Sequence, residues 1–272
     1  MKIVIPTYRR CDRQKTLSAI PKKWLKRTVL VVDEQDYRTM LSLQIAEVIP
    51  KAKFCVVPHT VRSIADKRAW ILGTFRDDKI LMLDDDLRFA RRKRLSPKSA
   101  ENLPPFQFTL ESATERDVDW AFTQIEKALD KYVHVGMSAR QGNNNLTDDW
   151  RWRENTRMMY ALGYQTKKVR RHCKLGRIQH REDMELCLQL LAQGFPNKSL
   201  LEVCVDQVYN SKGGASEERS VEASNADADK LAKMYPGLVK VTEREYKKSV
   251  PRKEVTVYWR KAYELAAMEG GH

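Results

Sequence analysis

The chain has few of the features that mark secreted, membrane-spanning or zinc-binding proteins. Its 272 residues include five cysteines with no CxxC pair, which argues against a disulfide framework and against a zinc site. No apolar run approaches the roughly 20 residues that a membrane-spanning helix needs. The chain also opens directly on a strand-like apolar run, without the core of a signal peptide, so we expect a reduced, cytoplasmic setting.

Acidic residues are scarce relative to basic ones. The chain has 36 Asp and Glu against 50 Lys and Arg, a net charge of +14. Solubility does not require a surplus of this size, so it favours a polyanionic partner, with nucleic acid ahead of an anionic membrane. The hydrophobic content of 42% still supports a substantial core. A chain of this length suits one large α/β domain, or one such domain with an appendage.

The first half of the chain alternates strand and helix patterns. Such alternation is typical of an α/β fold with a mostly parallel central sheet flanked by helices. In these sheets, ligands bind outside the carboxyl ends of the strands. The predicted strands are residues 2–5, 28–32, 54–57 and 79–83, and the predicted helices are residues 36–48 and 63–72.

The second half is less regular. We expect loops at 91–116 and 140–156 and a mobile segment at 210–229, because these stretches lack a core pattern. A domain over residues 1–210 with a C-terminal extension over 211–272 packed on it fits this pattern. The elements predicted here are helices at 116–131, 180–194 and 228–235, strands at 132–137, 201–205 and 255–259, and a hairpin of 158–162 and 165–169 around Gly163.

Three adjacent aspartates, Asp84, Asp85 and Asp86, follow the fourth predicted strand. Their carboxylates repel one another, so crowding them at a strand end gains nothing unless a cation lies there. Hard divalent cations take oxygen ligands and bridge to phosphate, which favours a metal that carries a nucleotide diphosphate. The alternative interpretation is that one aspartate caps the next helix and the others are solvated.

A second acidic pair, Glu182 and Asp183, opens the amphipathic helix predicted over residues 180–194. Helix physics alone favours a capping role, since the backbone dipole and the free N–H groups stabilise acids at a helix N-terminus. Beside a metal–diphosphate site, a separate carboxylate can instead remove the proton of an attacking hydroxyl. The two acidic motifs together therefore predict group transfer from an activated donor.

The order of these motifs resembles the GT-A glycosyltransferases. The resemblance rests on residues 3–8, 31–33, 66–68, 83–86 and 181–186 and covers residues 1–205. It implies that the first loop and the acid after the second strand hold the nucleobase, that residues after the third strand approach the diphosphate, and that the aspartates bind donor and metal. The residues concerned are Pro6, Thr7, Tyr8, Arg9 and Asp33 at the nucleobase, Arg62, Asp66, Lys67 and Arg68 toward the diphosphate, Asp85 at the donor, and Asp84 and Asp86 at Mn or Mg.

The same resemblance implies a catalytic base, and the chain departs from the family pattern in one respect. In inverting members the acidic pair supplies the general base, and we assign this role to Asp183, with Glu182 as its catalytic neighbour. Many members add a late histidine as a metal ligand, whereas only His272 follows His180 here. The metal is therefore expected to rely on the aspartates, the diphosphate and water, or on additional help from Asp206.

Basic residues border both acidic motifs in the sequence. No acidic residue occurs from Asn155 to Arg181. Neutralising several phosphates would produce salt-dependent binding, and tryptophans between arginines would stack on exposed bases. A solvated surface and packing under a loop are the alternatives. The residues predicted to bind nucleic acid are Arg91, Arg92, Lys93, Arg94, Trp150, Arg151, Trp152, Arg153, Lys167, Lys168, Arg170, Arg171 and Lys174.

With this layout, its basicity and residues 210–214, the chain is similar to the TET-associated glycosyltransferases of bacteriophages, which attach sugar to 5-hydroxymethylcytosine in DNA. The resemblance implies an inverting, metal-dependent transfer from a nucleotide-sugar, expected to be UDP-linked, to double-stranded DNA in an infected bacterial host. We expect no membrane and no obligate protein partner. The open alternatives are a glycosyltransferase for protein, lipid or polysaccharide, a nucleotidyltransferase, and a DNA-binding module without catalysis.

Overall fold

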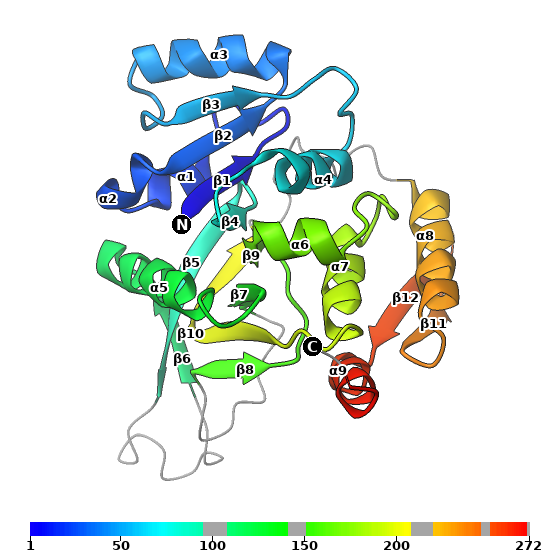
Figure 1. Cartoon of the computed structure of the whole chain (residues 1–272). Helices are drawn as coiled ribbons and strands as arrows, with labels where there is room; N and C mark the ends of the chain where they lie inside the picture. Colours follow the sequence, from blue (N-terminus) through cyan, green and yellow to red (C-terminus); the bar gives the residue numbers. More distant parts are fainter. Residues whose placement is uncertain (95–107, 141–150, 208–219, 246–250, 271–272) are drawn as a thin grey trace.

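A computed structural model describes residues 1–94, 108–140, 151–207, 220–245 and 251–270 (Figure 1). Its centre is a ten-stranded sheet with helices on both faces, so the predicted α/β class is confirmed. From one edge to the other the sheet contains β3 (Lys53–Val56), β2 (Thr28–Val32), β1 (Lys2–Pro6), β4 (Lys79–Leu83), β9 (Ala161–Gln165), β7 (His134–Ala139), β10 (Asn197–Gln207), β5 (Leu87–Arg94) and β6 (Phe108–Ser112), while β8 (Trp152–Glu154) pairs with β10.

The strands predicted in the first half of the chain form one parallel block. β1 pairs in parallel with β2 and β4, and β2 pairs in parallel with β3. All four strands therefore end on the same side, which we call the carboxyl end of the sheet, and begin at its amino end. Segments far apart in sequence meet at the carboxyl end for this reason alone.

The other half of the sheet is mixed. β9 runs antiparallel to β4 and β7, so Ala161 lies beside Leu83 at the carboxyl end. β10 is parallel to β7 and also ends there, whereas β5 starts there and runs antiparallel to β10 toward the amino end. The late strand predicted at 201–205 is thus confirmed as part of the longer β10.

Alternation along the strands divides the core into two layers. In β1, Ile3 and Ile5 face one apolar cluster and Val4 faces the other, as expected of a strand buried on both faces. The first cluster is covered by α1 (Lys15–Ala19), α2 (Lys22–Leu25), α3 (Glu34–Ile45) and α5 (Glu115–Ala128), and the second by α4 (Ile64–Thr74), α6 (Thr166–His172) and α7 (Glu182–Leu191).

The C-terminal elements pack on α7. They are α8 (Val221–Met234), the hairpin of β11 (Val239–Arg244) and β12 (Arg252–Val257), and α9 (Trp259–Met268). Leu231 and Ala262 belong to the same buried cluster as the apolar side of α7. Tyr235 Oη also donates to the buried Glu185 carboxylate at 2.8 Å. The boundary predicted at residue 210 lies outside the described residues.

The loop predicted at 91–116 is wrong, because most of its described residues form the antiparallel strands β5 and β6 and the start of α5. Leu87 and Phe89 are buried and anchor β5. The charged continuation stays extended because Arg91 pairs with Asp117 and Glu202 on neighbouring elements. The run of cations was predicted to be a loop, whereas Arg91 and Lys93 are paired with acids of neighbouring elements.

The hairpin predicted around Gly163 is also wrong. Gly163 lies inside β9, and a Cβ atom there would be 2.6 Å from the carbonyl oxygen of Val135. The glycine therefore permits close approach of β7 rather than a turn. Residues after Gln165 form α6, α8 begins at Val221 within the segment expected to be mobile, and β11 and α9 were not predicted.

Among the described residues, no helix combines the length and the apolarity that crossing a bilayer requires.

Candidate active site

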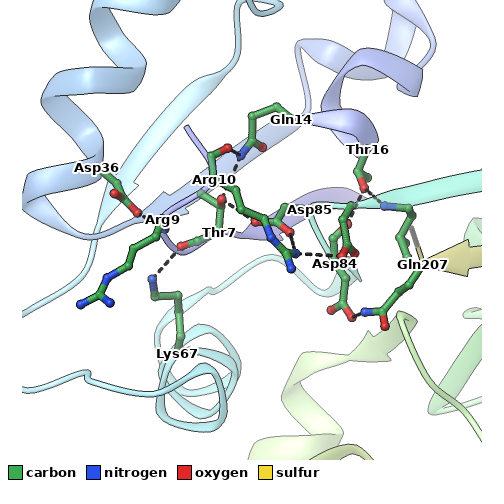
Figure 2. A network of polar contacts seen from close by, with 12 residues as sticks. Thr7, Arg9, Arg10, Gln14, Thr16, Asp36, Lys67, Asp84, Asp85 and Gln207 are labelled. Carbon is green, nitrogen blue, oxygen red and sulfur yellow. Dashed lines mark hydrogen bonds and ion pairs between the residues drawn. The ribbon is translucent and has the colours of Figure 1, made fainter. Parts of the chain in front are cut away.

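The three aspartates follow β4 at the carboxyl end of the sheet. Figure 2 shows Asp84 and Asp85 and some of their partners. Thr7 Oγ1 donates to Asp85 at 2.6 Å, and Arg10 Nη1 donates to Asp85 at 2.7 Å and to Asp86 at 2.8 Å. Asp84 instead pairs with an arginine of α4 and accepts from Gln207 Nε2 at 3.0 Å. No helix follows them, since β5 starts at Leu87, so the helix-capping interpretation is wrong.

Burial sets the electrostatics of this cluster. Burial raises the pKa of Asp86 to about 6, although the Arg10 guanidinium opposes the shift. Burial likewise raises the pKa of Asp85 against the opposing effects of Thr7 and Arg10. Asp86 Oδ1 is buried and accepts no hydrogen bond from a described residue. Such an orphaned carboxylate oxygen is the kind of group that a bound cation satisfies.

The aspartates fit a divalent metal of the kind found with nucleotides. In the part of the chain that the structure describes, no three His, Cys, Asp or Glu side chains converge into a closed metal cage. Mg²⁺ in nucleotide sites is usually held by one or two carboxylates together with phosphate oxygens and water. Asp86, with its orphaned Oδ1, and the neighbouring Asp84 can supply such carboxylates.

Arg68 joins the aspartates to α7. Its guanidinium pairs with Asp84 on one side and with Glu182 on the other. Burial by itself lowers the pKa of Arg68, but the charges of Asp84, Glu182 and Asp183 raise it overall, so the side chain stays protonated. The two acidic motifs, far apart in sequence, are therefore held together by one cation.

The carboxylates of Asp183 and Glu182 differ in their partners. α7 begins after Arg181, whose φ of 68° is left-handed, and Met184 N donates to Asp183 Oδ1 at 2.8 Å. Asp183 is half-buried and has no salt bridge to a described residue, whereas Glu182 is engaged by Arg68. A small pocket of about 30 Å³ lies beside the pair, with Arg68 and Lys174 in its lining.

The loop after β1 is tied to the end of β2. Lys67 Nζ donates to the Thr7 carbonyl at 2.8 Å and pairs with Asp33 Oδ1 at 3.0 Å. Lys67 is only 2% exposed, so it shapes the loop rather than projecting from it. The Arg9 backbone N–H donates to Asp36 Oδ2 at 2.7 Å (Figure 2). The Arg9 guanidinium lies 4.8 Å from the Tyr8 ring centre.

The remaining residues predicted at the donor lie at the same end. Pro6 ends β1 and is buried. Asp66 forms a capping box with Ser63 at the start of α4 and accepts from Gln179 Nε2 at 3.0 Å. Its hydrogen bonds lower the pKa of Asp66 although burial opposes them. Arg62 is exposed just before this helix. The structure thus brings the predicted donor residues together.

The described geometry agrees with a family assignment. Residues 1–214 match the TET-associated glycosyltransferase family. The chain belongs to this family. As a family member it is a glycosyltransferase, and the GT-A architecture recurs in its structural neighbours.

Two phage proteins are similar along most of the chain. A beta-glucosyl-HMC-alpha-glucosyl-transferase of Enterobacteria phage T6 is 26% identical over 246 residues, covering 87% of this chain and 81% of the phage protein. Its counterpart from Enterobacteria phage T2 is 26% identical over 245 residues, with the same coverage.

Solved structures share the fold at low identity. A mannosyltransferase from Pyrobaculum calidifontis in complex with GDP-Man and Mn²⁺ aligns with a TM-score of 0.55 and 13% identity, over 86% of this chain and 63% of that one. The glucosyl-3-phosphoglycerate synthase of Mycobacterium tuberculosis, with Mn²⁺ and UDP, aligns with a TM-score of 0.52 and 9% identity, over 94% and 86%.

In this glycosyltransferase, the basic residues of β5 do not border the aspartates. β5 leads away from them toward the amino end of the sheet. Arg92 is 2% exposed and its Nη1 donates to Ser138 Oγ at 2.7 Å, which differs from the predicted contact with DNA because a buried guanidinium cannot reach a phosphate. Arg91 is paired with two acids, and Lys93 pairs with Glu111. The Arg94 side chain lies outside the described set.

The Trp–Arg segment also lies toward the amino end. Trp152 and Arg153 pair with Leu200 and Ser199, near the start of β10. Lys198 Nζ is 5.4 Å from the Trp152 ring centre, and Arg151 Nε lies 3.5 Å from Glu202 Oε2. Trp150 and the stretch 210–214 fall outside the described residues.

The basic helix α6 begins at the amino end, because Thr166 N donates to the Asp78 carbonyl, just before β4. Arg170 Nη1 donates to the Phe75 carbonyl at 2.7 Å and so closes the end of α4. The other predicted cations here are exposed: Lys167, Lys168, Arg171 and Lys174. Only Lys174 is brought to the pocket beside the acidic pair.

Sequence reasoning missed several residues that shape this site. Arg10 directly follows the predicted first loop, so its positive charge could have indicated a partner for the aspartates. No feature of the sequence around Gln207 indicates a role in the site. Tyr160 has a φ of 68°, and its carbonyl accepts from Asp84 N at 3.0 Å. Burial raises the pKa of Tyr160, Asp84 and Asp183 add to the shift, and Arg157 opposes it. Tyr160 therefore lies between the two acidic motifs.

Proposed function

We propose that this chain transfers a hexose from a nucleotide-sugar, expected to be UDP-linked, to a hydroxyl of modified cytosine in double-stranded DNA. The observation that carries the proposal is the bridge of Arg68 between Asp84 and Glu182. The bridge holds the two acidic motifs together, which supports a diphosphate-binding cluster and a carboxylate base at one site in a member of a glycosyltransferase family. The names of the phage T6 and T2 relatives support a glucosyl group and a hydroxymethylcytosine base.

The donor would lie across the carboxyl end of the sheet. The loop from Pro6 to Arg9, together with Asp33, surrounds the place proposed for the nucleobase, and the exposed Arg62 would approach the diphosphate. Asp86 and Asp84 would hold Mn²⁺ or Mg²⁺. When bound, such a cation neutralises the charge of the leaving diphosphate. The metal complexes of the Pyrobaculum and Mycobacterium structures support this kind of cofactor.

Asp183 is the proposed base. The acceptor oxygen forms a bond to the anomeric carbon, the bond from that carbon to the diphosphate breaks, and the diphosphate leaves with the electron pair. The hydroxyl proton goes to a carboxylate oxygen of Asp183. The helix dipole at the start of α7 favours a negative charge there, so it would keep the carboxylate ionised before the reaction. Attack from the side opposite the diphosphate would invert the configuration.

A second acceptor is favoured by one observation. The phage relatives are named for alpha-glucosyl transfer to beta-glucosyl-HMC, a base that already carries a sugar. The acceptor hydroxyl would then belong to that sugar. If the donor is α-linked, an α-linked product also means retention, so the configuration of the product is a direct test of the inverting mechanism.

Mass spectrometry of modified DNA tests the proposal. Duplexes with cytosine, 5-hydroxymethylcytosine or its β-glucoside are incubated with Mn²⁺ and a panel of UDP- and GDP-sugars. A hexose added only to hydroxymethylcytosine supports the first acceptor, and one added only to the β-glucoside supports the second. Digestion with α- and β-glucosidase reads the linkage. A product that retains a nucleotide phosphate, or transfer to protein, lipid or glycan but to no DNA, would overturn the proposal.

A further inference from the structure

The C-terminal elements form one wall of a second cleft. This open cleft, of about 600 Å³, lies where α8 and β12 meet the start of α7. Arg157, Arg181 and Met184 line it from the catalytic part of the chain. Arg252 and Lys253 line it from β12, beyond the residues matched by the family.

The lining of the cleft is strongly positive. Four of its side chains are basic, and Glu254 is its one acid. The negative charge of Glu254 is matched by Arg244, whose Nε lies 2.9 Å from its Oε2. Arg157 is exposed and forms no hydrogen bond or salt bridge with a described residue. Lys253 is matched as well, because its Nζ lies 2.6 Å from Asp229 Oδ2 and 3.8 Å from Glu243 Oε1. The surplus of basic over acidic side chains in this concave lining still attracts anions, most strongly at low salt.

The wall is held in place by hydrogen bonds. Arg181 donates to the Ser224 carbonyl at 2.7 Å and to the Lys253 carbonyl at 3.0 Å. Lys253 N donates to Asn225 Oδ1 at 2.8 Å, which joins β12 to α8. The N-terminus of α8, capped by Ser220, also opens on the cleft. Its backbone dipole adds positive potential to that of the side chains.

The cleft adjoins the proposed base. Met184 follows Asp183 directly and contributes to the lining. The charge of Arg157 opposes the rise in the pKa of Tyr160, whereas the charges of Asp84 and Asp183 add to it. Arg157 therefore lies near the two acidic motifs. A polyanion seated in the cleft would therefore continue toward the reacting groups. The proposed nucleotide site, in contrast, lies among the loops after β1, β2 and β3.

We propose that this cleft binds the backbone phosphates that flank the modified base in the acceptor DNA. The inference rests on the proposed function, because it assigns the cleft to the acceptor and not to the donor. It also gives the C-terminal elements a role: they complete the DNA-binding surface beside Asp183.

The test removes two cations from the cleft. Arg157→Ala/Arg252→Ala is compared with wild type in fluorescence anisotropy with a hydroxymethylated duplex at several salt concentrations. Each lost phosphate contact lowers the magnitude of the salt slope by about 0.9, so we expect a change of nearly two and an affinity loss of roughly 10-fold or more at low salt. UDP affinity, measured by calorimetry, stays within about twofold if the cleft serves the acceptor alone.

The matched control removes the same charge elsewhere. Lys26 and Lys51 are exposed and precede β2 and β3 at the amino end of the sheet. Lys26→Ala/Lys51→Ala should leave the salt slope close to that of wild type. An equal loss in both double variants, or no loss in the cleft variant, overturns the inference. Weaker UDP binding with unchanged DNA binding also overturns it and makes the cleft a diphosphate site.

Two further measurements separate the possible failures. Arg157→Glu changes one exposed position, and thermal unfolding shows whether each variant is folded, so misfolding cannot pass for lost binding. If wild type binds duplexes but transfers no sugar to them, the proposed function fails while the cleft is still tested by the salt slopes. If wild type binds no duplex at all, both the cleft and the DNA acceptor are wrong.

Discussion

The charged side chains at the two ends of the sheet differ in burial and in pairing. At the carboxyl end, Asp84, Asp85 and Asp86 are largely buried and share two cations: Arg10 pairs with Asp85 and Asp86, and Arg68 pairs with Asp84. At the amino end, most of the cations of the basic helix α6 are exposed. The sequence of α6 is dense in basic residues, yet the structure buries or pairs few of them. Burial and pairing, rather than the number of charges, therefore identify the site.

The largest effect is expected at the proposed base. Asp183→Asn should lower turnover by roughly 10²–10⁴ because the hydroxyl proton loses its acceptor, while duplex affinity stays the same. Glu182→Gln is the matched control, since that carboxylate is paired with Arg68 and should affect positioning rather than proton transfer. Single-turnover transfer to modified DNA provides the measurement. Unchanged turnover of Asp183→Asn would remove the assignment.

A buried histidine at the amino end offers the next effect. Burial lowers the pKa of His134 to about 4, while its Nδ1 hydrogen-bonds the Gly163 carbonyl at 2.9 Å. The unfolded chain binds this proton near pH 6.5, so the stability that neutral His134 contributes is present above that pH. It is lost as the pH falls toward 4, by up to about 3 kcal/mol.

Urea unfolding between pH 7 and pH 4 checks this prediction. His134→Gln has no imidazole to titrate, so its free energy of unfolding should fall less steeply on acidification than that of wild type. The same slope in both proteins would show that His134 is not the titrating group.

The metal site sharpens the comparison further. Asp86→Asn should raise the Mn²⁺ concentration needed for half-maximal transfer by about 10-fold or more, because one of its oxygen ligands is weakened. Asp130→Asn is the control, since Asp130 pairs with Lys79 at the amino end. Titration of transfer rate against Mn²⁺ distinguishes them. Equal metal dependence in both variants would contradict a metal at Asp86.

The smallest effect is expected on α6. We keep the proposal that its exposed cations contact DNA, but only where a duplex is long enough to pass over the helix. Lys167→Ala/Lys168→Ala/Arg171→Ala should change the salt slope by about one unit or less on a long duplex, and not at all on one of about one helical turn. Anisotropy with duplexes of both lengths measures this. A large effect on the short duplex would show that α6 contacts the acceptor close to the reaction site.

The sequence predicted the secondary structure best where a single continuous run of residues determines a single strand or helix. The apolar runs before Pro6 and Asp84 indicated buried parallel strands, and the stripe after Asp183 indicated α7, because burial of a strand or a helix face imposes its own period. The acidic motifs at their ends were found for the same reason. Arg91 and Gly163 led to wrong predictions. A cation occurs both in loops and in strands where acids of neighbouring elements pair with it, and a glycine occurs both in turns and where two strands approach closely.

The sequence by itself therefore determined the alternation of strands and helices, the excess positive charge and the two acidic motifs, because each of these depends on neighbouring residues alone. Only the tertiary structure decided which charges meet. It placed Arg68 between Asp84 and Glu182, turned Gln207 toward Asp84, buried Arg92 and put α6 at the other end of the sheet. Such choices depend on strand order and direction, and these are settled by packing between segments that are distant in the chain.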